Sequence, residues 1–392
     1  MRILSIETSC DETAISLLSV SKNKIEILGD ALHSQIELHK QYGGVFPMMA
    51  KREHQKNLTP LLIKVLRESN FFEVSKSQVS SFKQNKLKKL LERETDLVKH
   101  FLKDIINIKK PKIDLIAVTK GPGLEPALWV GISFAKALGA LWDIPVIGVN
   151  HMEGHIVSVL VNRNESAKPQ ASSIQLNNKN QFPALALLVS GGHTELVLIK
   201  DWGKYEVIGK TKDDAVGEAF DKVARILGLP YPGGPQISNL ASKARSSKLQ
   251  PESCAVLPRP MMYTKDLDFS FSGLKTAVLY MVRDIPQMTD QIKMEIAKEF
   301  EDACIDVLIH KTKKAIEKFN VKTLIVGGGV SANNHLRNNL KTLAKNLKIN
   351  LHIPDKKLAT DNAIMIGIAG YLQSQRSKKR NMVIKAEGHL SL

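Results

Sequence analysis

The order of apolar and polar residues along the chain repeats once. An apolar run at residues 3–7 leads through a short polar tip into a second apolar run at 14–18, and the same order recurs at 185–189 and 195–199. Apolar runs joined by tips of small, hydrogen-bonding residues are typical of paired strands. The repeat predicts two related α/β lobes that face each other across a cleft, with two unrelated hairpins as the alternative.

Further apolar runs predict buried strands at 113–119, 144–149 and 323–326. An apolar-periodic stretch around 131–140 predicts a helix that follows the first of these strands. We therefore expect a first lobe over 1–150 and a second lobe over 151–360 that carries the metal and nucleotide motifs considered below.

Three segments depart from this pattern. Residues 72–112 hold many Lys and Glu residues at helical spacing, which predicts a solvated helical insertion in the first lobe. Residues 162–181 are polar and rich in Asn, Ser and Lys, so a loop is expected. A helix at 361–376 is expected to close the first lobe, and the basic tail from Gln373 is expected to fray.

Composition narrows the class of protein. The 392 residues are 43% hydrophobic and 24% charged, which is typical of a soluble globular protein. No secretory or transit pattern and no long apolar stretch is present, so we expect a cytoplasmic protein without a membrane span. Three scattered cysteines fit reduced thiols. The net charge of +17 favours a polyanion such as tRNA, although a lysine-rich composition can also reflect an AT-rich genome.

Two histidines form a candidate metal site. His151 and His155 are four residues apart on one face of a helix that begins at the carboxyl end of the expected strand 144–149. Their Cβ atoms would be roughly 6 Å apart, close enough to bind one divalent metal. The alternative is an ordinary surface pair. Glu153 follows the first histidine by two positions, unlike the His-Glu-x-x-His motif of zinc proteases. Asp361, at the start of the last helix, is the candidate third ligand or, alternatively, a helix cap.

Glycine turns and one helix suggest a nucleotide site. Asp221 lies on the polar side of the helix that begins near Gly217, where it could bind sugar hydroxyls or pair with Arg225. The glycines of the 231–236 turn allow close approach of a ligand to the backbone, or simply reverse the chain. The turn after strand 323–326 leads into a helix whose free N–H groups could face an anion.

Taken together, these motifs resemble a known family, the bacterial-type tRNA adenosine threonylcarbamoyltransferases (TsaD), which are related to the catalytic subunit of the KEOPS complex. Nine motifs occur in the family's order, and they cover almost the whole chain outside 72–112 and 162–181. They are Ile6-Glu-Thr-Ser-Cys-Asp-Glu-Thr, Gly121-Pro-Gly-Leu, His151-Met-Glu-Gly-His, Leu188-Val-Ser-Gly-Gly-His-Thr, Gly217-Glu-Ala-Phe-Asp-Lys, Tyr231-Pro-Gly-Gly-Pro, Phe269-Ser-Phe-Ser-Gly-Leu-Lys, Gly328-Gly-Val-Ser-Ala-Asn and Thr360-Asp-Asn-Ala.

The resemblance implies an actin-like ATPase (ASKHA, ribonuclease-H-like) fold. It also implies a metal-dependent acyl transfer from threonylcarbamoyl-adenylate to the exocyclic amine of the adenosine 3′ to the anticodon, in tRNAs that read codons beginning with adenine. His151, His155 and Asp361 would hold one divalent metal ion, iron or zinc, and Asp11 is the candidate catalytic residue that orients or deprotonates the amine. The implied contacts with the adenine nucleotide are Leu188, Val189, Ser190, Gly191, Gly192, Asp221, Gly234 and Asn333.

The chain also departs from the family pattern. Met48 stands where the family has Glu, and Lys120 and Glu125-Pro126 surround the Gly121-Pro-Gly turn in place of small residues. The implied partners are tRNA, threonylcarbamoyl-adenylate, a paralogous non-catalytic subunit and a small P-loop ATPase; the mitochondrial relative acts instead as a homodimer. Three rival functions are a metallo-endopeptidase, a non-catalytic ATPase-like scaffold and an actin-like kinase. The position of Glu153 argues against the first, and the histidine pair argues against the other two.

Overall fold

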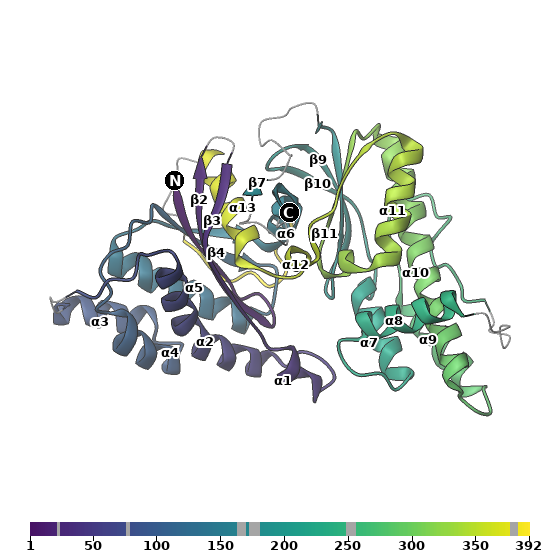
Figure 1. The fold of residues 1–392 in the computed structure, drawn as a ribbon, viewed down its shortest axis with the longest axis horizontal. Helices are drawn as coiled ribbons and strands as arrows, with labels where there is room; N and C mark the ends of the chain where they lie inside the picture. The colour runs from purple at the N-terminus through teal and green to yellow at the C-terminus, as the bar shows by residue number, and fades with distance from the viewer. Residues whose placement is uncertain (22–23, 76–78, 163–169, 172–180, 248–255, 377–382) are drawn as a thin grey trace. The chain divides into compact units, whose positions relative to one another are not determined.

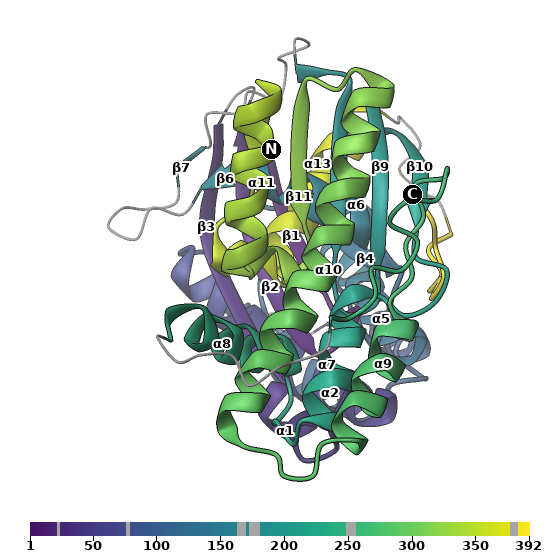
Figure 2. The ribbon, with the colours of Figure 1, turned by 90° about the vertical axis from the view of Figure 1, so that its right-hand side faces the viewer.

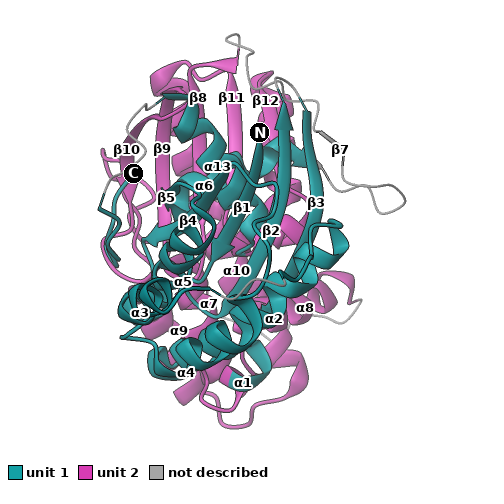
Figure 3. Cartoon of the chain, turned by 90° about the vertical axis from the view of Figure 1, so that its left-hand side faces the viewer, with its two compact units in different colours: residues 1–38, 45–177, 361–392 teal, residues 39–44, 178–360 magenta. Residues whose placement is uncertain are grey.

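The chain forms two compact units in the computed structural model (Figure 3). The first comprises residues 1–38, 45–177 and 361–392, and the second comprises 39–44 and 178–360. The structure describes residues 1–21, 24–75, 79–162, 170–171, 181–247, 256–376 and 383–392.

The first unit is built around a five-stranded sheet. The strands are β1 (Arg2–Glu7), β2 (Glu12–Ser21), β3 (Lys24–Ser34), β4 (Leu115–Gly121) and β5 (Val146–Asn150), in the order β3-β2-β1-β4-β5. Strands β1, β2 and β3 pair antiparallel, whereas β1, β4 and β5 run parallel. The parallel strands therefore end at the same edge of the sheet, where the candidate metal motif follows β5.

Helices cover both faces of this sheet. Helices α2 (Pro47–Glu68) and α5 (Glu125–Trp142) pack against each other beside the sheet (Figure 1), and α13 (Ala363–Arg376) packs on β1, β2, β4 and β5. Burial on two faces explains why β1 and β4 read as continuous apolar runs. Glycines let α13 approach closely, since a Cβ at Gly367 would lie 2.4 Å from the Leu18 side chain.

The segment 72–112 is not a solvated insertion. It contains α3 (Ser81–Leu90), α4 (Thr95–His100) and the π-helical turn η1 (Phe101–Ile105). Five of its apolar residues are fully buried in the core of the first unit, and the Phe101 and Phe134 rings pack edge to face with centroids 5.9 Å apart. The expectation of solvation was wrong because a buried stripe is present beneath the many lysines: Leu87, Leu91, Leu97, Phe101 and Ile105.

Residues 383–392 also contact the first unit, which corrects the expectation of a frayed tail for this part; residues 377–382 lie outside the described residues. Gly123 N donates to the carbonyl of Gly388 at 3.1 Å, and the Lys136 amine donates to the carbonyl of Ile384 at 2.7 Å. Of the expected loop at 162–181, residues 163–169 and 172–180 lie outside the described residues; β6 (Val161–Asn162) and β7 (Gln170–Ala171) pair antiparallel.

The second unit repeats the sheet of the first. Its strands are β8 (Ala184–Val189), β9 (Thr194–Asp201), β10 (Lys204–Lys210), β11 (Thr323–Gly327) and β12 (Asn350–His352), in the order β10-β9-β8-β11-β12. Strands β8, β9 and β10 pair antiparallel, and β11 extends the sheet in parallel between β8 and β12. The same topology in both units confirms the expected duplicated, ribonuclease-H-like α/β fold.

The helices of the second unit form a core with its sheet. The long α10 (Asp290–Phe319) runs along the unit together with α11 (Asn334–Leu347) (Figure 2), and α8 (Gly233–Ser246) packs against both α10 and α7 (Val216–Ile226). Phe220 of α7 and Phe300 of α10 pack edge to face with ring centroids 5.0 Å apart. The helices are α7 (Val216–Ile226), α8 (Gly233–Ser246), α9 (Ser272–Arg283), α10 (Asp290–Phe319), η4 (Gly329–Ala332), α11 (Asn334–Leu347) and α12 (Lys356–Ala359), with α1 (Ile36–Lys40) crossing between the units.

The division between the units differs from the expected boundary after residue 150. Helix α6 (His151–Val157), followed by the short turn η2 (Ser158–Leu160), lies in the first unit because it packs against α13. A Cβ at Gly154 would lie 3.1 Å from both Ile366 and Met365, so the two helices are in close contact. The histidines and Asp361 therefore belong to one unit. Within the described residues, no helix is both long and apolar enough to cross a membrane.

Candidate metal centre and nucleotide pocket

The two histidines are set by the start of α6. This helix begins directly after β5, and the Asn150 side chain caps it by accepting hydrogen bonds from Met152 N at 2.8 Å and Glu153 N at 3.3 Å. An asparagine at the N-cap fixes the residue at which a helix begins. His151 and His155 then lie one turn apart on one face, with their rings edge to face and centroids 4.7 Å apart.

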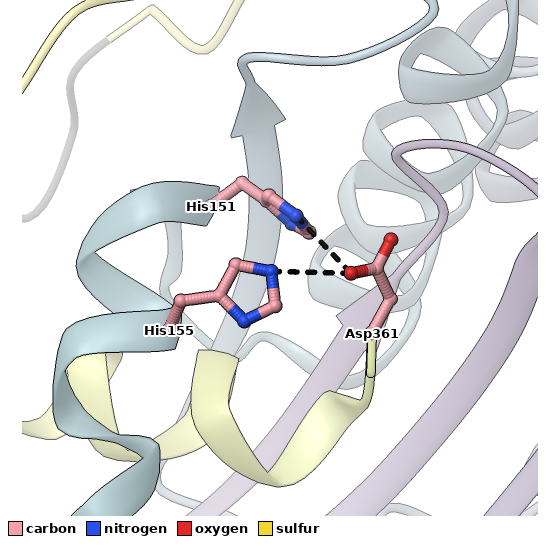
Figure 4. Close-up of side chains that lie close together, drawn as sticks. All are labelled: His151, His155 and Asp361. Carbon is pink, nitrogen blue, oxygen red and sulfur yellow. Dashed lines mark ion pairs between the residues drawn. The ribbon is translucent and has the colours of Figure 1, made fainter. Parts of the chain in front are cut away.

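Asp361 completes a group of three side chains (Figure 4). Its Oδ1 lies 3.3 Å from His151 Nε2 and 3.2 Å from His155 Nε2. Asn362, one residue later, accepts from Met365 N at 3.0 Å and so performs the capping that was the alternative role for Asp361. One ligand atom from each of the three residues lies within 4.8 Å of the others, which brings the three candidate ligands together.

Burial and charge act in opposite directions on these groups. Burial disfavours a charged His151, but the Asp361 and Glu7 carboxylates outweigh it and raise the pKa of His151 well above its usual value. Burial lowers the pKa of His155. Although burial opposes it, the charge of His151 and the close contacts with both imidazoles hold the pKa of Asp361 well below its usual value. Without a metal, the geometry therefore favours a charged His151 and a neutral His155.

The residues present fit a transition-metal ion. Both ring nitrogens of His155 are buried, and neither has a hydrogen-bond partner within the described part of the chain. Its Nε2 is near Asp361 but outside hydrogen-bond geometry. A buried polar nitrogen without a partner is destabilising, and a metal would satisfy it. Two imidazoles and one carboxylate are a ligand set that suits zinc or iron(II) and leaves coordination positions open.

Glu153 has a different role from that of a protease base. Its Oε1 lies 2.6 Å from the Arg376 guanidinium at the end of α13, and the side chain is nearly buried. This ion pair joins α6 to α13. A carboxylate engaged in this way is poorly suited to activate water, which weighs against the endopeptidase alternative.

The candidate catalytic residue Asp11 lies in the tip between β1 and β2 and is largely buried. Burial, together with the charges of Asp11 and Asp361, raises the pKa of the adjacent Glu12 well above its usual value. Asp11 is not one of the three clustered side chains.

The second unit contains a pocket of about 540 Å³. Of the eight expected nucleotide contacts, Gly191, Asp221, Gly234 and Asn333 line it. Leu188 and Val189 are fully buried in β8, whereas Ser190 and Gly192 form the adjoining turn. The other lining residues are Gly217, Phe220, Pro232, Pro235, Ser238, Ser242, Arg245, Glu301, Gly329, Val330, Ala332, Asn334, His335 and Asn338.

Asp221 connects two of the helices around this pocket. Its Oδ1 accepts a hydrogen bond from Gly233 N at 2.7 Å, which holds the start of α8 against α7. Arg225, the partner expected for a surface ion pair, donates to the carbonyl oxygen of Gly43. The position of Asp221 in the pocket wall thus favours the ligand-binding interpretation over a purely surface role.

A buried polar network supports the same pocket. Asn333 Oδ1 caps α11 by accepting from Leu336 N at 2.9 Å, and its Nδ2 donates to Glu301 Oε1 at 2.7 Å. Arg245 donates to Glu301 Oε2 at 2.6 Å, and Ser238 Oγ donates to Glu301 Oε1 at 2.7 Å. Sequence reasoning missed Ser238, Arg245 and Glu301. The available signal was Glu301, a carboxylate among the core-facing positions of α10.

Two units with the same sheet topology, one with a candidate metal site and the other with a glycine-lined pocket, define a protein with a duplicated, ribonuclease-H-like α/β fold. The chain matches the family model described as "TsaD: tRNA N6-adenosine threonylcarbamoyltransferase" over residues 26–79 and 86–368, and it belongs to this family. The family membership confirms the resemblance found from the motifs. The metallo-endopeptidase and scaffold alternatives are not favoured.

Two relatives of this chain carry the same name as the family. The chain is 41% identical over 382 residues to the tRNA N6-adenosine threonylcarbamoyltransferase of Burkholderia thailandensis, with 96% of this chain and 93% of that one covered. It is 40% identical over 378 residues to the protein of the same name from Paraburkholderia xenovorans, with the same coverage. The family match runs through residues 86–112, so most of the segment 72–112 belongs to the shared sequence and is not an addition to it.

A solved structure shows the same fold at low identity. Full-length HypF, in a phosphate- and nucleotide-bound form, has a TM-score of 0.51 and 11% sequence identity. The alignment covers 97% of this chain and 56% of HypF. This likeness concerns the fold alone.

Proposed function

We propose that this chain transfers the threonylcarbamoyl group of threonylcarbamoyl-adenylate to N6 of the adenosine 3′ to the anticodon, in tRNAs that read codons beginning with adenine. Family membership supports this acyl transfer. The observation that carries the proposal is the cluster of three candidate ligand atoms within 4.8 Å of one another. A chain of this family thus has side chains that could hold a metal ion.

His151, His155 and Asp361 would hold one divalent metal ion, zinc or iron. When bound, the metal would polarise the carbonyl oxygen of the threonylcarbamoyl group. The second oxygen of Asp361 lies 3.5 Å from Ser9 Oγ, so the tip after β1 helps to orient this carboxylate. Asp361 is thereby held in place by groups on both of its oxygens.

The pocket of the second unit would hold the adenylate. Its volume of about 540 Å³ is within the range of sites for nucleotide-sized ligands. Asp221 would accept hydrogen bonds from ribose hydroxyls, and Gly191, Gly234 and Asn333 would contact the nucleotide. Leu188, Val189, Ser190 and Gly192 would shape the turn against which it binds. Glycines without a Cβ allow close approach of backbone N–H groups to a phosphate.

The transfer balances as a single acyl substitution. The N6 nitrogen forms a bond to the carbamoyl carbon, and the bond from that carbon to the phosphate oxygen breaks, so AMP leaves with the electron pair. The proton lost from N6 would pass to Asp11, whose burial supports a role in proton transfer. The transfer needs no oxidant, reductant or further co-substrate.

The proposed partners follow from the substrate and the charge. A net charge of +17 suits binding to the phosphates of tRNA. We further propose that the chain works in the cytoplasm with a paralogous non-catalytic subunit and a small P-loop ATPase. The basic residues of 72–112 remain available for tRNA, but deleting this segment would remove part of the core of the first unit.

Mass spectrometry of tRNA nucleosides tests the function directly. Cells depleted of this protein should lose N6-threonylcarbamoyladenosine, and the wild-type gene should restore it. The His151→Ala gene should not restore it, although the variant protein accumulates to the same level. Normal modification in depleted cells would contradict the proposal. Restoration by His151→Ala would contradict the role of the metal site alone.

A further inference from the structure

A carboxylate that belongs to neither the metal cluster nor the pocket faces His151. Glu7 is the last residue of β1 and is fully buried. Its Oε2 lies 3.0 Å from His151 Nδ1, whereas His151 Nε2 faces Asp361. The two nitrogens of one imidazole are thus divided between two carboxylates.

Three parallel strands bring these residues together. In the sheet register, Ile6 of β1 is paired with Val118 of β4, and Thr119 of β4 is paired with Val149 of β5. Glu7 and Thr119 therefore lie side by side at the strand ends, and His151 follows at the end of β5. The carboxyl ends of parallel strands are where α/β folds concentrate their functional groups.

The Glu7 carboxylate is itself fixed by hydrogen bonds. Thr119 Oγ1 donates to Oε2 at 2.6 Å, and Ser9 N donates to Oε1 at 2.5 Å. Both oxygens are therefore engaged, and the side chain has little freedom to turn away from His151. A buried carboxylate in such a setting has a defined direction, which is what an orienting group requires.

A carboxylate that accepts from Nδ1–H fixes the tautomer of a histidine and leaves the Nε2 lone pair free for a metal. We propose that Glu7 is a positioning residue of the metal centre, which holds His151 in the orientation and tautomer that present Nε2 to the ion. This proposal rests on the proposed metal site. Within the described residues, His155 lacks a comparable partner at Nδ1. Of the two imidazoles, His151 is therefore the one that a buried carboxylate orients.

A purely structural role for Glu7 is the competing explanation, because its bond to Ser9 N also holds the tip after β1. Glu153 offers a matched control. It is a nearly buried carboxylate on α6 itself, and its Oε1 pairs with Arg376 at the end of α13. Removing either charge perturbs the same unit, and Glu7 is the one of the two with a recorded hydrogen bond to His151.

The test is zinc affinity of the purified full-length chain, measured by competition with a chromophoric chelator. Glu7→Gln should weaken zinc binding by about 10- to 100-fold. Thr119→Val, which removes one hydrogen bond to Glu7 and leaves His151 intact, should produce a smaller loss in the same direction. Glu153→Gln should remain within about threefold of wild type. Imidazole ¹⁵N spectra of the zinc-loaded wild type should show His151 protonated at Nδ1.

The outcomes separate this inference from the proposed function. Equal zinc affinity for wild type, Glu7→Gln and Thr119→Val, with a large loss in His151→Ala, would overturn the role of Glu7 and leave the metal site standing. An equal loss in Glu7→Gln and Glu153→Gln would assign Glu7 a structural role only. A wild-type chain that binds zinc no better than His151→Ala would overturn both proposals. If Glu7→Gln does not fold, Thr119→Val decides the question.

Discussion

The metal cluster and the buried network beside the pocket differ in how their buried polar groups find bonding partners. At the cluster, two nitrogens of His155 are buried without hydrogen-bond partners among the described residues. At the pocket, Asn333, Ser238 and Arg245 together supply donors to both oxygens of Glu301. The first group can complete its bonding only with something added, whereas the second is complete by itself.

This difference separates ligand binding from folding. Changes at an incomplete site should reduce affinity for the missing partner more than they reduce stability. Changes in a closed network leave a buried group unsatisfied and should reduce stability first. Asp221 lies in the pocket wall outside this network, so a substitution there should affect nucleotide binding more than a substitution of Arg245 does.

The largest expected effect is on the network. Arg245→Ala removes the cation beside the buried Glu301 carboxylate. Breaking one partner of a buried ion pair leaves an uncompensated charge, so the free energy of unfolding should fall by about 3–5 kcal/mol. Urea denaturation monitored by circular dichroism measures this. Lys298→Ala removes a half-exposed partner of Asp302 and should cost no more than about 0.5 kcal/mol. Equal effects of the two substitutions would contradict the contrast.

At the metal cluster, His155→Ala should reduce metal affinity more than it reduces the free energy of unfolding. Loss of an outer-shell partner weakens metal binding by about 10- to 100-fold, so loss of a ligand should exceed about 100-fold. The stability of the metal-free chain should change less, because the His155 imidazole has no hydrogen-bond partner among the described residues to leave unsatisfied and Asp361 keeps its contact with His151. Metal analysis after dialysis measures the effect. His54→Ala is the control, since this buried imidazole hydrogen-bonds to Thr13 and Cys10 instead. Metal loss in both variants would refute a specific role for His155.

Asp221→Ala tests whether the pocket walls carry the nucleotide affinity. A hydrogen bond to a charged group contributes about 1.5–3 kcal/mol, so AMP binding should weaken by about 10- to 150-fold. Titration calorimetry with AMP gives the value. Glu218→Ala, on the exposed side of the same helix, should bind AMP as the wild type does. An unchanged affinity in Asp221→Ala would restrict Asp221 to holding Gly233.

The last expected effect is a change of metal affinity with pH. Burial opposes charging of His151, but Asp361 and Glu7 outweigh it and raise its pKa in the metal-free chain. A metal must displace that proton, so affinity should rise with pH by about tenfold per unit until His151 is neutral. Chelator competition from about pH 6 to about pH 8 measures the slope. A flat profile would show that no proton is displaced.

Stability of the metal-free chain should follow the opposite course. A folded pKa raised above the unfolded value gives stability that is fully present below about pH 6.5 and lost as the pH rises through the folded pKa. His151→Ala should lack this loss. Urea midpoints of both proteins across the same pH range provide the comparison, and parallel curves would refute the assignment.

The proximity of His151, His155 and Asp361 was largely predictable from the sequence. The spacing of His151 and His155 and their place after an apolar strand indicated one helix face at a sheet edge, and Asp361 was recognisable as a carboxylate at the start of a helix. The repeated strand pattern likewise predicted both sheets. These features are local, because strand period, helix period and capping operate within a few residues.

Other features depend on contacts that are distant in sequence. Helix α6 belongs to the first unit because Gly154 packs against Met365 and Ile366, which chain order could not reveal. The stripe through Leu87 and Phe101 was hidden by the many lysines that share its helices. Glu301 and Arg245 are 56 positions apart and belong to no short motif, so their network could be found only from the structure.

The chain passes from the second unit to the first between Thr360 and Asp361. Thr360 packs on the pocket lining, since a Cβ at Gly329 would lie 4.0 Å from its Cγ2. One peptide bond therefore joins a residue against the pocket wall to a candidate metal ligand. Any coupling between the two affinities must be reciprocal: the factor by which a nucleotide changes metal binding equals the factor by which the metal changes nucleotide binding. Two titrations, each performed with and without the other ligand, must return the same number.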